Sequence, residues 1–150
     1  MSARIAAHPD TVYALVSDVT RTGEWSPENT GGRWLGGATG PAPGARFCGS
    51  NRRGWRRWST TCTVVDAVPG RRFAFDVAVG PVPAARWAYD LEPDGDATVV
   101  TERWTDRRPA WFARVAGATM GIDDIRAHNR RNMETTLDNL TRVVDRSGDA

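Results

Sequence analysis

The sequence predicts an α+β domain in which a curved antiparallel sheet wraps a long C-terminal helix. Strand-like segments follow one another from residue 45 to residue 106, and helical patterns lie on either side of them. That order favours an α+β architecture over alternating βαβ units. The 150 residues contain no internal repeat and no linker, so we expect one domain over residues 1–150.

The N-terminal third is predicted to hold an edge strand, two short helical segments and a further strand. Met1–Ala7 is a brief apolar stretch with strand character. Proline and aspartate at the start of Pro9–Val19, followed by apolar residues at helical spacing, predict a helix there. Arg21–Pro27 is expected to be a second short helix or turn, since its proline stops a helix. A strand at Gly31–Leu35 and a breaker-rich loop at 36–44 follow.

The central region is predicted to form an antiparallel meander. Glycine and proline clusters such as Pro69-Gly70 and Gly80-Pro81 separate the strand-like segments at hairpin spacing. The five predicted strands are Ala45–Asn51, Arg56–Ala67, Arg72–Val79, Ala84–Glu92 and Ala97–Asp106.

A helical pattern extends from Pro109 to about Asp145. Gly117 and Gly121 weaken its first part, and Asp123 is a candidate cap for a fresh start. The last ~22 residues are therefore the robust helix. Its inward stripe is predicted to be Ile122, Ile125, Asn129, Met133, Leu137, Leu140 and Val144.

Alternate strand residues face opposite sides of a sheet, so the apolar set in each strand identifies the buried face. This parity places Cys48 outward and Cys62 inward, which argues against a disulfide between them. The predicted inward side chains are Phe47, Gly49, Asn51, Trp58, Thr60, Cys62, Val64, Phe73, Phe75, Val77, Val79, Trp87, Tyr89, Leu91, Val100, Glu102 and Trp104.

Three inward tryptophans, Trp58, Trp87 and Trp104, predict a hollow on this face, with Trp34 nearby. Ligand pockets are mostly apolar with a few polar groups, and typically exceed roughly 300 Å³. The alternative is that the rings only fill a core. The loop at 36–44 is expected at the mouth of the hollow. Phe112 and Met120 either line its entrance or close a helix end against the sheet.

Four inward polar residues, Asn51, Tyr89, Glu102 and Asn129, are candidates for contacts with a ligand. Burying a polar group without a hydrogen-bond partner costs about 1–3 kcal/mol, so each of these residues is expected to have a partner in the protein or in a ligand. Each is alternatively a satisfied structural group, and Glu102 could then pair with an arginine.

Composition excludes several classes of function. All 20 basic residues are arginine, which rules out lysine Schiff-base chemistry and a P-loop. The net charge of +2 predicts no strong global attraction to nucleic acid or acidic membranes. No apolar run reaches membrane-spanning length and the N-terminus lacks a secretory signal, so we expect a cytoplasmic location.

Two further motifs are interpreted as carrying no chemistry. The segment Asn51–Trp58 interleaves four arginines with two tryptophans, which resembles a nucleic-acid grip. We expect instead a hairpin with solvated arginines, or a contact surface for a regulatory partner. His8 and His128 have no further ligands at metal spacing, and His128 is predicted to face solvent. We therefore predict no metal and no cofactor.

Several segments together resemble the START-like, or SRPBCC and Bet v 1-like, superfamily in its polyketide cyclase/dehydrase branch, with an actinobacterial character. The segments that carry this resemblance are 7–13, 17–19, 24–27, 44–47, 51–54, 58–64, 69–75 and 133–140. The resemblance implies a helix-grip fold: a seven-stranded antiparallel sheet, two short helices after the first strand, and a long C-terminal helix over a hydrophobic cavity. Relatives usually have a longer first strand than Met1–Ala7.

Two functional hypotheses follow. The first is binding of an apolar or aromatic small molecule, lipid-like or polyketide-like, between sheet and helix by a monomer or homodimer. The expected ligand-binding residues are Trp34, Phe47, Trp58, Thr60, Phe75, Trp87, Tyr89, Trp104, Phe112, Met120, Asn129, Met133 and Leu137. The second is a cyclase or dehydratase in the same cavity, with Glu102 as base and Tyr89 or Asn51 polarising a carbonyl. The matched motifs contain no catalytic constellation.

Overall fold

The computed structural model describes residues 1–148 and confirms the predicted architecture. Seven antiparallel strands form one sheet in the order β1-β7-β6-β5-β4-β3-β2. The strands are β1 (Ser2–Ile5), β2 (Asn29–Leu35), β3 (Arg46–Arg53), β4 (Arg56–Val68), β5 (Arg72–Val79), β6 (Val82–Asp94) and β7 (Ala97–Asp106). The helices are α1 (Pro9–Val16), the 3₁₀ helix η1 (Val19–Glu24), α2 (Ala110–Met120) and α3 (Ile125–Gly148).

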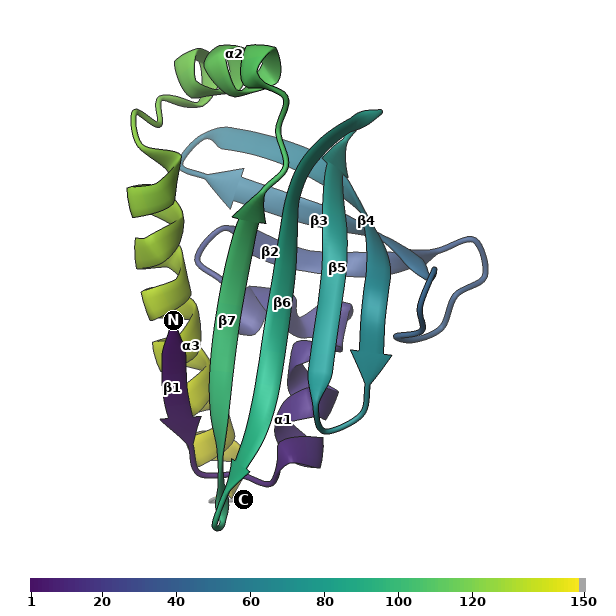
Figure 1. Ribbon diagram of the computed structural model, residues 1–150, viewed down its shortest axis with the longest axis vertical. Coiled ribbons are helices and arrows are strands. Elements are labelled where there is room, and N and C mark those ends of the chain that lie inside the picture. Colours follow the sequence, from purple (N-terminus) through teal and green to yellow (C-terminus); the bar gives the residue numbers. More distant parts are fainter. Residues whose placement is uncertain (149–150) are drawn as a thin grey trace.

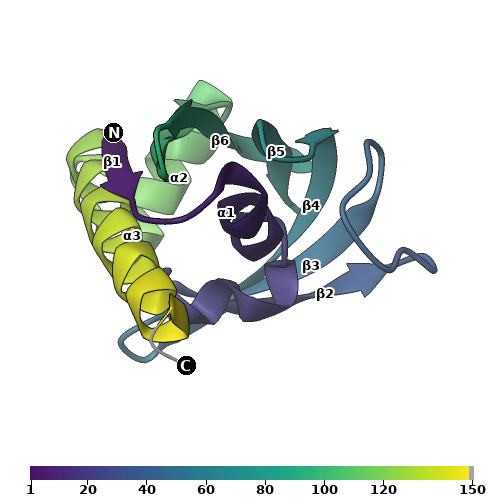
Figure 2. The same ribbon diagram turned by 90° about the horizontal axis from the view of Figure 1, so that it is seen from below.

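The sheet curls around a concave side that helices occupy. Figure 2 shows α1 lying inside the curl, with α3 closing its open side between β1 and β2. In Figure 1, α2 lies across the end of the molecule opposite α1. The predicted bounds of β5 and β7 are confirmed, whereas β6 is longer at both ends and β1 is shorter than Met1–Ala7.

The first helix ends three residues earlier than predicted. Ser17 donates its hydroxyl to the Tyr13 carbonyl at 2.7 Å and ends α1. The Asp18 carboxylate then accepts from the backbone N–H of Thr20 at 3.1 Å and starts η1. This side-chain cap starts a separate 3₁₀ helix two residues before the predicted Arg21–Pro27 segment, and η1 overlaps that segment as far as Glu24. The residue after η1, Trp25, is buried with 1% of its surface exposed.

The long C-terminal helical pattern is divided by Gly121. Its φ of 63° is left-handed, a conformation that glycine adopts without strain, and it ends α2. The cap of α3 is Asp124, whereas the prediction of Asp123 was wrong. Asp124 Oδ1 accepts from the backbone N–H groups of Arg126 at 2.9 Å and Ala127 at 3.1 Å.

This cap gives a testable difference between adjacent aspartates. We expect Asp124→Ala to lower the free energy of unfolding by about 1 kcal/mol, the usual value of a lost N-cap. Asp123→Ala is the matched control, because Asp123 is exposed and makes no such bond, and it should change stability little. Urea denaturation of both variants measures the difference, and equal losses would contradict the assignment.

The core lies at the end of the curl that α1 occupies. Side chains from α1, the sheet and the second half of α3 pack together there, which leaves the other end of the concave side less filled. The fully buried members with the largest side chains include Val12, Phe73, Val100 and Leu140. Both thiols, Cys48 and Cys62, are free. No helix within residues 1–148 is long and apolar enough to cross a membrane.

Candidate functional site

A cavity of about 250 Å³ lies between the sheet, η1 and the first half of α3. We call it the inner cavity. A second cavity of about 490 Å³, the outer cavity, lies beneath α2. The two share the lining residues Glu28, Trp58, Arg108, Ile125 and Asn129. The inner cavity alone is smaller than the roughly 300 Å³ expected of a ligand pocket, and the two adjoining spaces together exceed that size.

One wall of the inner cavity is aromatic, and strand register explains it. Phe75 on β5 pairs with Trp87 on β6, which pairs with Trp104 on β7. The three side chains therefore lie in one row across neighbouring strands and face the same side. A parallel row contains Phe73, Tyr89 and Glu102. All six residues line the inner cavity, so β5, β6 and β7 present rings to its interior.

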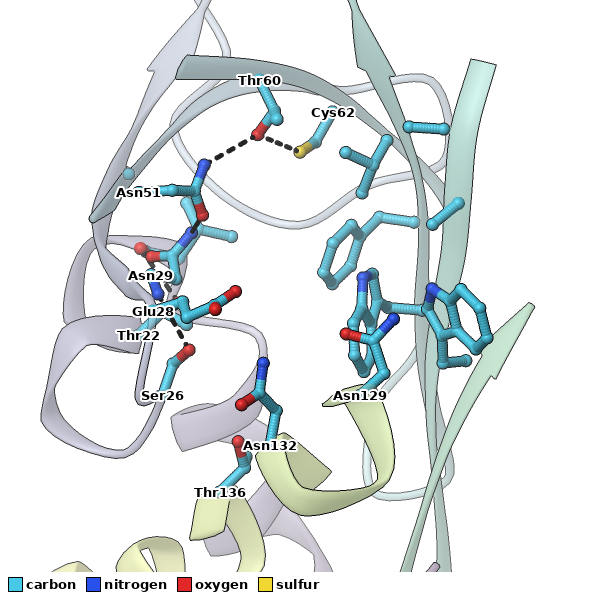
Figure 3. A pocket seen from close by; sticks show the side chains of 18 of the residues that line it. Thr22, Ser26, Glu28, Asn29, Asn51, Thr60, Cys62, Asn129, Asn132 and Thr136 are labelled. Carbon is cyan, nitrogen blue, oxygen red and sulfur yellow. Dashed lines mark hydrogen bonds between the residues drawn. The ribbon is translucent and has the colours of Figure 1, made fainter. Parts of the chain in front are cut away.

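The facing wall is polar, and the sequence predicts only its members Asn51 and Thr60. Its side chains come from the segment between η1 and β2 and from β3 and β4: Thr22, Ser26, Glu28, Asn29, Asn51 and Thr60 (Figure 3). Asn29 donates to Asn51 and Asn51 donates to Thr60, each at 3.4 Å. Bonds of this length are weak, so these amides retain capacity to bind a ligand.

Gly49 allows this close approach of polar side chains. A Cβ atom there would lie 2.9 Å from Thr60 Oγ1 and 3.2 Å from Asn29 Nδ2. Any side chain at position 49 would therefore push into the polar wall.

Helix α3 contributes polar side chains to the inner cavity instead of the predicted apolar ones. Asn129, Asn132 and Thr136 line it, and Figure 3 shows Asn129 and Asn132 reaching into the space. Met133 and Leu137, which we expected in the wall, do not line either cavity. An α-helix has 3.6 residues per turn, so residues 129, 132 and 136 lie on the face that points into the cavity. Leu137 lies on the neighbouring face and packs in the core.

Glu102 is a buried carboxyl group at the aromatic wall. It is 2% exposed, and its Oε1 accepts from the Tyr89 hydroxyl at 3.0 Å. Its Oε2 is buried and has no hydrogen-bond partner within residues 1–148. Burial raises the pKa of Glu102 to about 8, although the Tyr89 bond and the terminal ammonium lower it. Burial also raises the pKa of Tyr89 well above its usual value.

Glu102 is therefore mainly a neutral carboxylic acid at pH 7. In that state it can donate a hydrogen bond to an oxygen atom of a ligand. No arginine pairs with it in the described part of the chain; its partner is Tyr89.

His128 does not face solvent, contrary to the sequence prediction. Its Nε2 lies 2.7 Å from Glu28 Oε1 and 3.2 Å from Asn132 Nδ2, and its side chain is 17% exposed. Glu28 lines both cavities, so the pair lies where they adjoin. Arg108 is at the same place and makes two bonds to Asp106. These side chains form a polar neck between the two spaces.

The structure brings ten of the predicted site residues together around the inner cavity: Phe47, Asn51, Trp58, Thr60, Phe75, Trp87, Tyr89, Glu102, Trp104 and Asn129. Met120 lines the outer cavity. Trp34 instead packs edge-on against Phe47, with 5.5 Å between ring centroids, and Phe112 packs against Trp111 on α2. The loop at 36–44 lines neither cavity, contrary to its expected position.

The side chains at the cavity offer no set of metal ligands. Within residues 1–148, no three His, Cys, Asp or Glu side chains gather closely enough to hold a metal ion. Burial raises the pKa of the Cys62 thiol to about 12, which keeps it protonated and unreactive.

Comparison with known proteins agrees with the fold. The chain is similar to a solution structure of the polyketide-cyclase-like protein Cgl2372 from Corynebacterium glutamicum, at 35% identity and a TM-score of 0.60, covering 97% of this chain and 89% of that one. It is also similar to NE0264 from Nitrosomonas europaea, at 15% identity and a TM-score of 0.71, covering 100% and 95%.

A third similar structure is the two-domain ARO/CYC protein StfQ of the steffimycin biosynthetic pathway. Identity is 14%, the TM-score is 0.70, and the match covers 99% of this chain and 45% of StfQ. No curated protein matches the sequence. The family of polyketide cyclases/dehydrases and lipid transport proteins matches residues 1–145. Together with the 35% identity to Cgl2372, this match shows that the chain belongs to the polyketide cyclase/dehydrase and lipid transport family.

Proposed function

We propose that this protein binds an apolar or aromatic small molecule, with a lipid-like or polyketide-like character, in the inner cavity. The observation that supports the proposal is the two-sided lining. The row Phe75–Trp87–Trp104 offers flat rings, and the facing wall offers amides and hydroxyls. A planar ligand with oxygen atoms along one edge fits both surfaces, since rings stack on rings and edge oxygens meet donors.

Two side chains are suited to form hydrogen bonds with the oxygen atoms of such a ligand. Asn129 is 7% exposed and makes no side-chain hydrogen bond to another described residue. Glu102 has one carboxyl oxygen without a partner. Because buried polar groups normally find partners, the unpaired Glu102 oxygen favours a ligand that supplies one, and the Asn129 amide is free to bind the same ligand. The size of the inner cavity favours a compact ring system, and a longer ligand would extend past the polar neck into the outer cavity.

The proposal predicts binding that depends on the volume of the inner cavity. Tryptophan fluorescence and titration calorimetry with a dihydroxynaphthalene, a dihydroxyanthraquinone, a flavonoid and palmitate measure it. We expect the hydroxylated aromatic probes to bind and Val77→Phe to weaken binding about tenfold or more, because the new ring occupies cavity space.

The matched control is Ala78→Phe, the next residue of β5, whose side chain faces the other side of the sheet. It should bind the probes as the wild type does. Absence of binding by every probe, or unchanged binding by Val77→Phe, would contradict the proposal.

A second candidate function is proton-transfer catalysis in the same cavity, of the cyclase or dehydratase type. Glu102 and Tyr89, 3.0 Å apart, favour it because a neutral carboxylic acid near the aromatic wall can act as a general acid. With a pKa of about 8, Glu102 is mainly protonated at pH 7, which favours action as a general acid beside the base role expected from the sequence. Turnover retained in full by Glu102→Gln on an identified substrate would exclude this role.

The cellular location and the oligomeric state stay predictions. We propose a cytoplasmic monomer or homodimer, and size-exclusion chromatography with light scattering of the purified protein tests the oligomeric state.

A further inference from the structure

Helix α2 is apolar on two opposite sides. Ala113, Ala116, Gly117 and Met120 line the outer cavity on one side. On the other side, Trp111 is 60% exposed and Val115 is 56% exposed. Trp111, Arg114, Val115, Ala118 and Thr119 recur at steps of three and four residues and form one exposed stripe. Two of its members, Arg114 and Ala118, also border the outer cavity, so the stripe begins at the cavity rim. None of the residues of α2 is fully buried, so the helix is a thin cover over the outer cavity.

The tip of the β3–β4 hairpin lies beside the C-terminal end of α2. Trp55 at this tip is 83% exposed, and the Arg56 guanidinium lies 4.8 Å from the centre of its ring. Arg56 also reaches α2, because a Cβ atom at Gly121 would lie 3.7 Å from its terminal nitrogen. Figure 1 shows the hairpin tip and α2 at the same end of the molecule. We call Trp55, Arg56, Trp111, Arg114 and Val115 the entrance patch.

The surroundings of the entrance patch are basic. The hairpin tip holds Arg52, Arg53, Arg56 and Arg57, and α2 holds Arg114. No acidic residue occurs from 50 to 60 or from 110 to 120. Among residues 1–148, none of these five arginines forms a salt bridge, whereas Arg107 and Arg108 at the start of α2 pair with Asp76 and Asp106. The low net charge of the chain therefore conceals a local excess of positive charge.

We propose that the entrance patch docks onto the surface of an anionic lipid bilayer. Arginines attract acidic headgroups, and tryptophan rings are suited to the boundary between headgroups and acyl chains. An exposed apolar stripe flanked by arginine is typical of helices that lie in that boundary. The patch combines a helix face and a hairpin tip, and its two exposed tryptophans lie beside arginines that form no salt bridge within residues 1–148. This pairing of exposed rings with positive charge favours a bilayer boundary over an acidic protein.

Docking by this end has a consequence for ligand access. The inner side of α2 covers the outer cavity, so a membrane-dissolved compound would reach the polar neck without crossing bulk water. The inference goes beyond ligand binding, because docking depends on outward side chains and ligand binding on inward ones.

Vesicle co-sedimentation tests the proposal. We expect the protein to bind vesicles of equal parts phosphatidylcholine and phosphatidylglycerol at low salt and to bind them weakly at high salt. It should not bind vesicles of pure phosphatidylcholine. The variants Trp111→Ala with Val115→Ser, and Arg56→Gln with Arg57→Gln, should each reduce binding about tenfold or more. The control is Val68→Ser with Arg71→Gln, which removes an exposed apolar and a basic residue at the β4–β5 turn and should change nothing.

Thermal unfolding checks that every variant folds, and probe titration without vesicles should be unchanged in the two docking variants. Absence of binding to the anionic vesicles overturns the proposal, as does equal loss in the control. Binding to polyglutamate without binding to the vesicles would also overturn the proposal. The partner of the patch would then be an acidic protein. Loss of probe binding alone would affect the proposed function and leave docking intact.

Discussion

Glu102→Gln should remove a pH-dependent loss of stability on the order of 5 kcal/mol, because the carboxyl group is buried in the native protein and solvated in the unfolded chain. The pKa is about 8 when folded, against 4.5 for an ordinary glutamate. Between these values the native state keeps a proton that the unfolded chain releases. Stability from this group is therefore fully present below about pH 4.5 and falls as pH rises to about 8.

Paired unfolding curves measure this effect. Glutamine resembles the protonated acid, so wild type and Glu102→Gln should have similar stability near pH 5, whereas the variant should be several kcal/mol more stable near pH 9. Carboxylates whose pKa is lowered by arginine, such as Asp76 beside Arg86, contribute equally to the stability of both proteins. Their contribution cancels when the two stability curves are subtracted. Glu92→Gln, on an exposed part of β6, is the matched control. Parallel curves for wild type and Glu102→Gln would contradict the assigned burial.

Phe73→Ala should lower the free energy of unfolding by about 3–5 kcal/mol, and Phe75→Ala by roughly half as much. The two rings lie on the same face of β5, with centroids 5.5 Å apart. Phe73 has no exposed surface and belongs to the core, whereas Phe75 is only partly buried and lies in the aromatic row of the inner cavity. A ring that already borders empty space loses fewer packing contacts when it is removed.

Urea denaturation of the two variants gives the comparison, and their m-values check that the unfolding transition is unchanged. Equal losses would mean that the space beside Phe75 is filled by other side chains. Phe75→Ala should also enlarge the inner cavity, so it should still bind the larger probes.

The sheet could be predicted from the sequence because strand parity and turn residues are local signals. Alternation placed Phe75, Trp87, Tyr89, Glu102 and Trp104 on one face, and cross-strand register then aligned them in rows. The resemblance to a known family supplied the strand count and the closing helix, which the structure confirms.

Only the strand residues of the polar wall, Asn51 and Thr60, could be predicted, because the others lie in the segment from η1 to the start of β2, which has no periodicity. Ser26 and Asn29 follow η1, whose start depends on the Asp18 side chain and not on an apolar pattern. A signal did exist on α3: Asn132 follows Asn129 by three residues, which puts two polar side chains on one helix face. His128 and Glu28 are 100 positions apart in the chain, so no local sequence pattern indicates their contact.

The basic surface near α2 was underestimated for a related reason. Net charge averages over the whole molecule, while docking depends on where charges gather. The sequence predicts a hairpin at Asn51–Trp58, but the proximity of this hairpin to α2 depends on the approach of Arg56 to Gly121, which only the folded chain reveals.

A crystal structure of the protein soaked with a dihydroxynaphthalene tests the hollow between sheet and α3 most directly. We expect density for the probe between the Phe75–Trp87–Trp104 row and the polar wall, with an oxygen within hydrogen-bond distance of Glu102 or Asn129. Side chains that close the space, or a probe bound only at the molecular surface, would contradict the presence of a ligand-binding cavity.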